Sequence, residues 1–85
     1  MPEVRFTTHS FEQLGERDIN RSLVREAVMN PDQVLEGRRG RKIAHKRLSV
    51  NEREYLMRVI YEETGESRLV VTVYLTSKVA KYWRI

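Results

Sequence analysis

The stretch REYLMRVIYEETGESRLVVTVYLT, residues 53–76, alternates apolar and polar side chains on either side of a Thr64-Gly65 pair. This period of two predicts a β-hairpin, because strand side chains point alternately to the two faces of a sheet and Thr-Gly favours a turn. In the first strand, one face holds Tyr55, Met57, Val59 and Tyr61. In the second strand, one face holds Leu69, Val71, Val73 and Leu75, and the other holds Val70, Thr72 and Tyr74. A strand that is apolar on one face and nearly so on the other is typical of a sheet interior.

Two more strands are expected before this hairpin. QVLEG, residues 33–37, has the pattern of a short strand, and Arg38-Arg39-Gly40 can turn the chain into RKIAHKRLSV, residues 41–50. Alternation along that segment places Lys42, Ala44, Lys46 and Leu48 on one face and Arg41, Ile43, His45 and Arg47 on the other. The four consecutive strands predict an antiparallel meander.

The N-terminal part is expected to add one strand and two helices. EVRFT, residues 3–7, alternates like a strand, and THSFEQLGER, residues 8–17, fits a short helix capped by Thr8. Asn20 caps a second helix, which Pro31 ends. The apolar stripe of this second helix is Leu23, Val24, Ala27 and Val28. The predicted fold class is α+β, one domain over residues 1–85, with the helices packed on one face of the sheet and the other face left for function. The tail SKVAKYWRI, residues 77–85, extends the last strand or forms a helical turn.

The composition excludes several classes of function. There is no cysteine, which excludes thiolate metal sites and fits a reducing compartment, and two histidines are too few for a zinc site. No glycine-rich phosphate loop is present. We therefore expect neither a metal nor a cofactor. The longest apolar run is far too short to span a membrane and MPEVRF does not resemble a signal peptide, so the expected location is cytoplasmic.

Positive charge is concentrated in one segment. GRRGRKIAHKR, residues 37–47, contains six Arg or Lys, one His and no acid, within a chain of net charge +4. Exposed cations without neighbouring acids attract phosphates, so this segment predicts contact with nucleic acid. A solvated hairpin and a surface for an acidic protein partner are the alternatives.

Three segments carry a resemblance to a known family. HSFEQLGERDI, residues 9–19, resembles the opening signature of a widespread family of small bacterial and archaeal domains of unknown function. NPDQVLEGRRGRKIAHKR, residues 30–47, and VVTVYLTSKVAKYW, residues 70–83, resemble later parts of the same family. Two positions depart from its pattern: Gln13 stands where the family often has Arg, and Asp18 where Gly is common.

The resemblance implies a fold similar to that of the RelE/ParE toxins and, more distantly, of barnase-like and colicin-type ribonucleases. It implies a metal-independent ribonuclease that acts as the toxin of a toxin–antitoxin pair. The expected partners are RNA (mRNA or tRNA, on or off the ribosome) and a small acidic antitoxin. Since ParE-like relatives act on a protein, the fold alone does not fix the substrate.

Metal-free RNA cleavage uses the RNA 2′-hydroxyl as the nucleophile and needs a proton acceptor, cations on the phosphate and a proton donor. The catalytic candidates are His9, Arg17, Lys46 and Tyr82. The nucleic-acid-binding candidates are Arg38, Arg39, Arg41, Lys42, His45, Arg47, Lys78 and Lys81. Structural roles are the alternatives: a histidine at a helix start, an arginine paired with helix glutamates, a histidine in a half-buried strand, or an aromatic tail docked on the core. A binding module that does not cut RNA, and a domain that binds only its antitoxin, also remain open.

Overall fold

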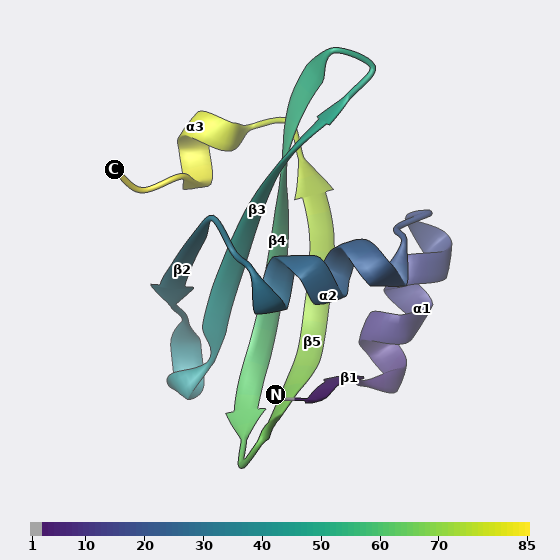
Figure 1. Ribbon diagram of the computed structural model, residues 1–85, viewed down its shortest axis with the longest axis vertical. Helices are drawn as coiled ribbons and strands as arrows, with labels where there is room; N and C mark the ends of the chain where they lie inside the picture. Colours follow the sequence, from purple (N-terminus) through teal and green to yellow (C-terminus); the bar gives the residue numbers. More distant parts are fainter. Residues whose placement is uncertain (1–2) are drawn as a thin grey trace.

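The computed structural model describes residues 3–85, so the first two residues of the expected domain lie outside the described part. Its sheet has the strand order β1-β5-β4-β3-β2 (Figure 1). The elements are β1 (Glu3–Phe6), α1 (Thr8–Glu16), α2 (Arg21–Met29), β2 (Gln33–Glu36), the 3₁₀ turn η1 (Arg38–Gly40), β3 (Lys42–Val50), β4 (Arg53–Thr64), β5 (Ser67–Thr76) and α3 (Val79–Tyr82).

The α+β class is confirmed, but the sheet is not purely an antiparallel meander. Strands β2 to β5 are joined in sequence order by antiparallel pairing, and β1 adds to the free edge of β5 in parallel. The sheet is therefore five-stranded and mixed. A parallel pair needs a long connection, and the chain between β1 and β5 includes both α1 and α2.

Helices α1 and α2 cover one face of the sheet and begin at side-chain caps. Thr7, rather than the expected Thr8, accepts a hydrogen bond from Ser10 N at 3.1 Å and caps α1. Asn20 caps α2 as expected, accepting from Ser22 N at 2.7 Å. Leu23 is 42% exposed, so the buried stripe of α2 is narrower than expected. The core between these helices and the sheet consists of Val4, Leu14, Ile19, Val24, Ala27, Val28, Ala44, Met57, Val59, Tyr61, Val70 and Val73.

An irregularity in β5 changes which of its residues reach this core. Ile60 of β4 lies opposite Thr72, whereas the next residue, Tyr61, lies opposite Val70. Val71 is thus an extra residue, as in a β-bulge. Val70 and Val73 consequently both enter the core, and the expected single face of Leu69, Val71, Val73 and Leu75 is wrong.

Helix α1 also covers the part of the β5 edge that lies beyond β1. The Ser10 hydroxyl donates to Val70 O at 2.8 Å, and the Gln13 side-chain oxygen accepts from Val73 N at 3.1 Å. Ser10 and Gln13 are both buried. Gln13, one of the two departures from the family pattern, therefore binds the backbone of β5 and faces away from solvent. The other departure, Asp18, has φ +52°, the left-handed conformation that glycine adopts without strain.

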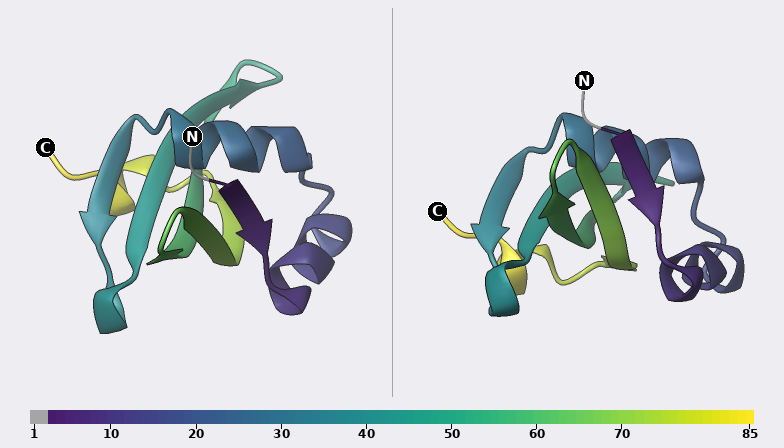
Figure 2. Two further views of the ribbon diagram at one scale, coloured as in Figure 1. Left: turned by 60° about the horizontal axis from the view of Figure 1, so that its bottom comes forward. Right: turned by 90° about the horizontal axis from the view of Figure 1, so that it is seen from below.

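The third helix lies on the other side of the sheet. After β5, the tail forms the short helix α3, which corresponds to the expected helical turn. Seen from below, α2 and α3 lie on opposite sides of the sheet (Figure 2). The face opposite α1 and α2, expected to be left entirely for function, is thus partly covered by the C-terminal tail.

Candidate functional site

A row of four polar side chains crosses this second face of the sheet. Gln33 of β2 lies opposite His45 of β3, His45 lies opposite Arg58 of β4, and Arg58 lies opposite Tyr74 of β5. Directly opposed residues of neighbouring strands point to the same face of a sheet. The four side chains are therefore aligned by strand register alone.

Hydrogen bonds connect this row from end to end. Arg58 Nε lies 3.0 Å from His45 Nε2, and His45 Nδ1 lies 3.1 Å from the side-chain oxygen of Gln33. A guanidinium can only donate, so His45 Nε2 must accept, and the imidazole proton is on Nδ1, from where it donates to Gln33. At the other end, Arg58 Nη1 donates to the Tyr74 hydroxyl. The geometry therefore requires a neutral imidazole in one tautomer.

The C-terminal tail covers the middle of the row. The Trp83 ring stacks on His45, with ring centroids 6.3 Å apart and an angle of 27° between the planes. The Tyr82 ring lies against the guanidinium of Arg58, whose central carbon is 4.1 Å from the ring centroid. The backbone N of Arg84 donates to the side-chain oxygen of Gln33 at 3.1 Å. His45 consequently has no exposed surface.

Burial and Arg58 both act on the protonation of His45. Its pKa is lowered from 6.5, first by burial and then by the positive charge of Arg58. Burial disfavours the charged form of histidine, and a neighbouring cation does the same. His45 is therefore neutral at neutral pH, in agreement with the tautomer that its hydrogen bonds require.

Within residues 3–85, Arg58 has no acidic partner, unlike the three cations Lys42, Lys46 and Arg47 of the neighbouring strand β3. Among the described residues it forms no ion pair, and its contacts are His45, Tyr74 and Tyr82. It is only partly buried. A fixed guanidinium without a counter-charge is suited to binding an anion such as a phosphate.

A hollow of about 410 Å³ opens on the same face, beside this row. Ile43 and Ile60 lie opposite each other, two residues along their strands from His45 and Arg58, and form its floor. The turn between β2 and β3 forms its rim through Gly37, Arg38, Arg39 and Arg41. Arg38 and Arg39 are exposed and form no ion pair within residues 3–85.

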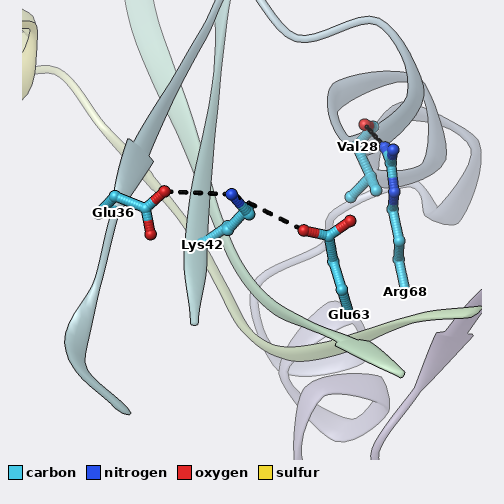
Figure 3. Close-up of polar contacts among 5 residues, drawn as sticks. All are labelled: Val28, Glu36, Lys42, Glu63 and Arg68. Carbon is cyan, nitrogen blue, oxygen red and sulfur yellow. Dashed lines mark hydrogen bonds and ion pairs between the residues drawn. The ribbon is translucent and has the colours of Figure 1, made fainter. Parts of the chain in front are cut away.

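Most of the basic run at residues 37–47 is neutralised by acids from elsewhere in the chain. Lys42 lies 3.1 Å from Glu36 and 3.7 Å from Glu63 (Figure 3), and its pKa is raised chiefly by the hydrogen bond to Glu36. The other ion pairs are Arg41–Glu62 at 2.7 Å, Lys46–Asp32 at 3.7 Å and Arg47–Glu54 at 2.8 Å. Four of the six cations are thus paired, which leaves Arg38 and Arg39 as the unpaired ones in this described segment.

The structure does not bring the four expected catalytic residues together. His9 and Arg17 are exposed on and just after α1, which packs on β5. Lys46 lies on the α2 side of the sheet, where its ammonium donates to Asn30 O at 2.7 Å. Tyr82 lies on the opposite face, against Arg58. These positions are incompatible with one catalytic cluster made of all four residues.

Lys46 and a second cation, Arg68, instead hold the C-terminal end of α2. Lys46 binds the carbonyl of Asn30, the C-cap residue, and Arg68 of β5 donates to Val28 O at 2.9 Å (Figure 3). The last carbonyls of a helix lack partners within the helix and carry partial negative charge, so cations placed there are stabilising. A structural role accounts for the position of Lys46.

The expected nucleic-acid-binding residues are distributed unevenly. Arg38 and Arg39 lie at the rim of the hollow, and Lys78 and Lys81 are exposed at and within α3. Arg47 is held by Glu54 and lies 4.8 Å from the Trp83 ring centroid. His45 is buried beneath Trp83 and out of reach of a ligand.

Gln33, Arg58 and Tyr74 are site residues that the sequence patterns did not indicate. Arg58 lies in an acid-rich segment, so the charge pattern of the sequence does not indicate a binding residue there. The signal that could have found it is the Asn51-Glu52 pair, which forms a two-residue turn because Val50 pairs with Arg53. That turn fixes the register of β3 on β4 and so places His45 opposite Arg58.

Within residues 3–85, no three His, Asp or Glu side chains are grouped so that they could hold a metal ion. No helix in the same range combines the length and the apolar character needed to cross a membrane.

Comparison with known proteins gives one match. A family catalogued as a domain of unknown function (DUF4258) matches residues 6–75, which include the whole row from Gln33 to Tyr74 but not the tail that covers it. No curated protein and no solved structure matches the chain.

Proposed function

We propose that this chain, which belongs to the DUF4258 family, binds RNA on the sheet face opposite α1 and α2. The observation that carries the proposal is the position of three arginines without acidic partners among the described residues. Arg38 and Arg39 lie on the rim of the hollow, and Arg58 lies beside its floor. RNA supplies phosphates at regular spacing, and each phosphate bound by a cation releases counterions.

The other cations of the basic run contribute less to this surface, because an ion pair must be broken before they can bind a phosphate. Arg41 and Arg47, for example, already hold Glu62 and Glu54. The binding surface is therefore smaller than the net charge suggests. It depends on Arg38, Arg39 and Arg58, with Lys81 available on the exposed side of α3.

The test is the salt dependence of RNA affinity. Fluorescence anisotropy with a labelled single-stranded RNA should give an association constant whose logarithm falls linearly with the logarithm of the salt concentration. The slope should be about −0.7 for each phosphate contact. The double variant Arg38→Gln/Arg39→Gln should bind more weakly, with a slope reduced by about 1.4 if each arginine contacts one phosphate.

A matched control removes the same charge from the other side of the molecule. Arg21 and Arg25 of α2 are exposed and unpaired within the described chain. Arg21→Gln/Arg25→Gln should keep the parent slope. Equal weakening by the two double variants would mean that net charge, rather than this face, attracts the RNA.

Cleavage of RNA by a toxin is the second candidate, and the contacts of Arg58 favour it. A half-buried arginine held by a neutral imidazole and lying between Tyr74 and Tyr82 is placed to stabilise a phosphate on which charge builds. The RNA 2′-oxygen would attack phosphorus and lose its proton to water. The bond to the 5′-oxygen would break, and Tyr82 would protonate that oxygen. A small acidic antitoxin would cover the same arginines.

Cleavage of this kind leaves a 2′,3′-cyclic phosphate and a 5′-hydroxyl, which mass spectrometry of the RNA fragments detects. Arg58→Gln should lower the rate about 100-fold, as the loss of one charge-stabilising donor does. Equal cleavage by parent and variant would indicate a contaminating nuclease. Intact RNA with and without ribosomes would leave binding as the function, and co-purification of a small acidic protein from the native host would support the antitoxin.

A further inference from the structure

We infer that the hollow between the β2–β3 turn and the β3–β4 strands is a subsite for one unpaired nucleotide, with the base inside and its phosphates on the rim. The inference rests on the proposed RNA binding and specifies its substrate as single-stranded or looped RNA. The hollow has a volume of about 410 Å³, within the usual range for small-molecule sites.

The floor of the hollow suits the flat face of a base rather than a phosphate. Ile43 and Ile60 are directly opposed on β3 and β4 and only partly buried, so their side chains form an apolar platform. A phosphate gains nothing from such a surface. Each of the four bases has an apolar face. Proteins therefore commonly hold single-stranded RNA by stacking or packing against its bases, whatever the sequence.

The rim supplies charge in two forms. Arg38 and Arg39 are exposed and without ion pairs in the described chain, so they are available to phosphates on either side of the base. Arg41 is fixed by Glu62, with Nε 2.7 Å from the carboxylate. A guanidinium held in one orientation can stack on a base or donate to its edge.

The turn that forms the rim is already folded over the floor. Gly37 N donates to Arg41 O at 2.7 Å, and Arg41 N donates to Arg38 O at 3.1 Å. A Cβ on Gly37 would lie 3.1 Å from Arg41 O and 3.3 Å from Ile43 Cγ1, so a side chain at this position would push the rim and the floor apart by a few tenths of an ångström. Because the turn is already ordered, binding a ligand costs little conformational entropy at this site.

The shape of the site selects against duplex RNA. A base reaches an apolar floor behind an arginine rim only when it is not stacked and paired within a helix. A polybasic surface without a floor would bind single and double strands alike through their phosphates. The prediction that follows is a preference for bases that are free.

The test compares three probes on the full chain: a single-stranded oligouridine, an abasic ribose-phosphate oligomer of equal length, and an RNA duplex. Anisotropy should show the oligouridine bound about tenfold more tightly than the abasic oligomer, the order of effect that one stacked base produces. Ile60→Thr keeps a β-branched side chain on β4 but makes the floor polar. It should weaken oligouridine binding severalfold, leave abasic binding unchanged, and keep the salt slope of the parent.

The matched control is Val34→Thr, an equivalent change at a 42%-exposed residue of β2 whose alternation places it on the other face. It should bind all probes like the parent, and thermal unfolding checks that both variants are folded. Equal affinity of the parent for oligouridine and abasic oligomer, with a normal salt slope, would overturn the nucleotide subsite and leave RNA binding intact. Absence of salt-dependent binding to every probe would overturn both.

Discussion

Arg58 and His45 are joined across β3 and β4 by a 3.0 Å hydrogen bond in which the guanidinium donates to the imidazole Nε2. Protonation of His45 would put a donor and a second positive charge against Arg58, in a place where His45 has no exposed surface. With both ring nitrogens protonated, the imidazole could no longer accept the hydrogen bond from Arg58. The contact therefore links the protonation state of one buried residue to the stability of the second sheet face.

The first prediction concerns the pH dependence of stability. The pKa of His45 is lowered in the folded chain from 6.5, so the unfolded state binds a proton more readily. The stabilisation is fully present above pH 6.5 and is lost as pH falls towards the folded-state pKa, with a slope of up to about 1.4 kcal/mol per pH unit. Urea unfolding between pH 7.5 and 5 should measure this loss.

The control for this experiment uses the two histidines of the chain. His45→Gln removes the titrating group and should flatten the dependence, whereas His9→Gln keeps His45 and should retain it. The carboxylate of Glu54, whose pKa is lowered from 4.5 by the hydrogen bond from Arg47, titrates below this range. A slope that persists in His45→Gln would assign the pH dependence to other groups.

The second prediction separates a structural from a catalytic role for Lys46. Its ammonium donates to the Asn30 carbonyl at the end of α2, so Lys46→Met should lower the free energy of unfolding by about 1 kcal/mol. The affinity for RNA should not change, because Lys46 lies on the side of the sheet away from the arginines. Loss of RNA cleavage or binding with unchanged stability would contradict this assignment.

The third prediction concerns the β3–β4 turn. Asn51 and Glu52 have φ +50° and +66° and form the two central residues of a hairpin turn closed by Val50 and Arg53. Positive φ at both positions is typical of type I′ turns, for which Asn-Gly is the preferred pair. Glu52→Gly should therefore stabilise the fold by about 0.5–1 kcal/mol, which an increase in the midpoint of thermal unfolding would show. A lower midpoint would mean that the Glu52 side chain contributes more than its backbone strain costs.

Alternation along the chain was enough to assign the two faces of β3 and most of β4. It predicted that Ala44 and His45 lie on opposite faces of the sheet, and the structure places Ala44 in the core under the helices and His45 on the other face. It failed in β5, because the extra residue Val71 reverses which residues face the core on one side of the bulge. A bulge has no sequence signature where the neighbouring residues are all apolar or β-branched. Local patterns determine which side a residue faces, but only while the ladder is regular.

The charge pattern was less informative than the hydrophobic pattern, for a related reason. The run at residues 37–47 contains no acid, yet Arg41 finds Glu62, which is 21 residues away in sequence. Such pairs depend on the register between strands, and composition does not contain that register. The arginine that matters most to the site, Arg58, is likewise defined by its neighbours across the sheet and not by its neighbours in sequence.

The last prediction tests whether the C-terminal tail keeps His45 neutral. Trp83 lies over His45 and is the only tryptophan of the chain, so its fluorescence reports directly on this contact. Replacing it with alanine opens His45 to water, which removes the largest cause of its lowered pKa. Trp83→Ala should therefore be less stable than the parent at pH 7.5 by about 1–2 kcal/mol, less than the loss for a fully buried tryptophan because Trp83 is only partly buried.

The difference in the free energy of unfolding between the parent and Trp83→Ala should shrink as pH falls. The pKa of His45 is lowered less in the variant, so the variant loses less stability on acidification. Trp83→Phe keeps an aromatic cover and should retain most of the pH dependence of the parent. In the parent itself, Trp83 fluorescence should change over the same pH range as stability, because a protonated His45 no longer accepts the bond from Arg58 and the tail above it is released. A pH dependence of stability that is identical in the parent and in Trp83→Ala would show that the tail does not control the protonation of His45.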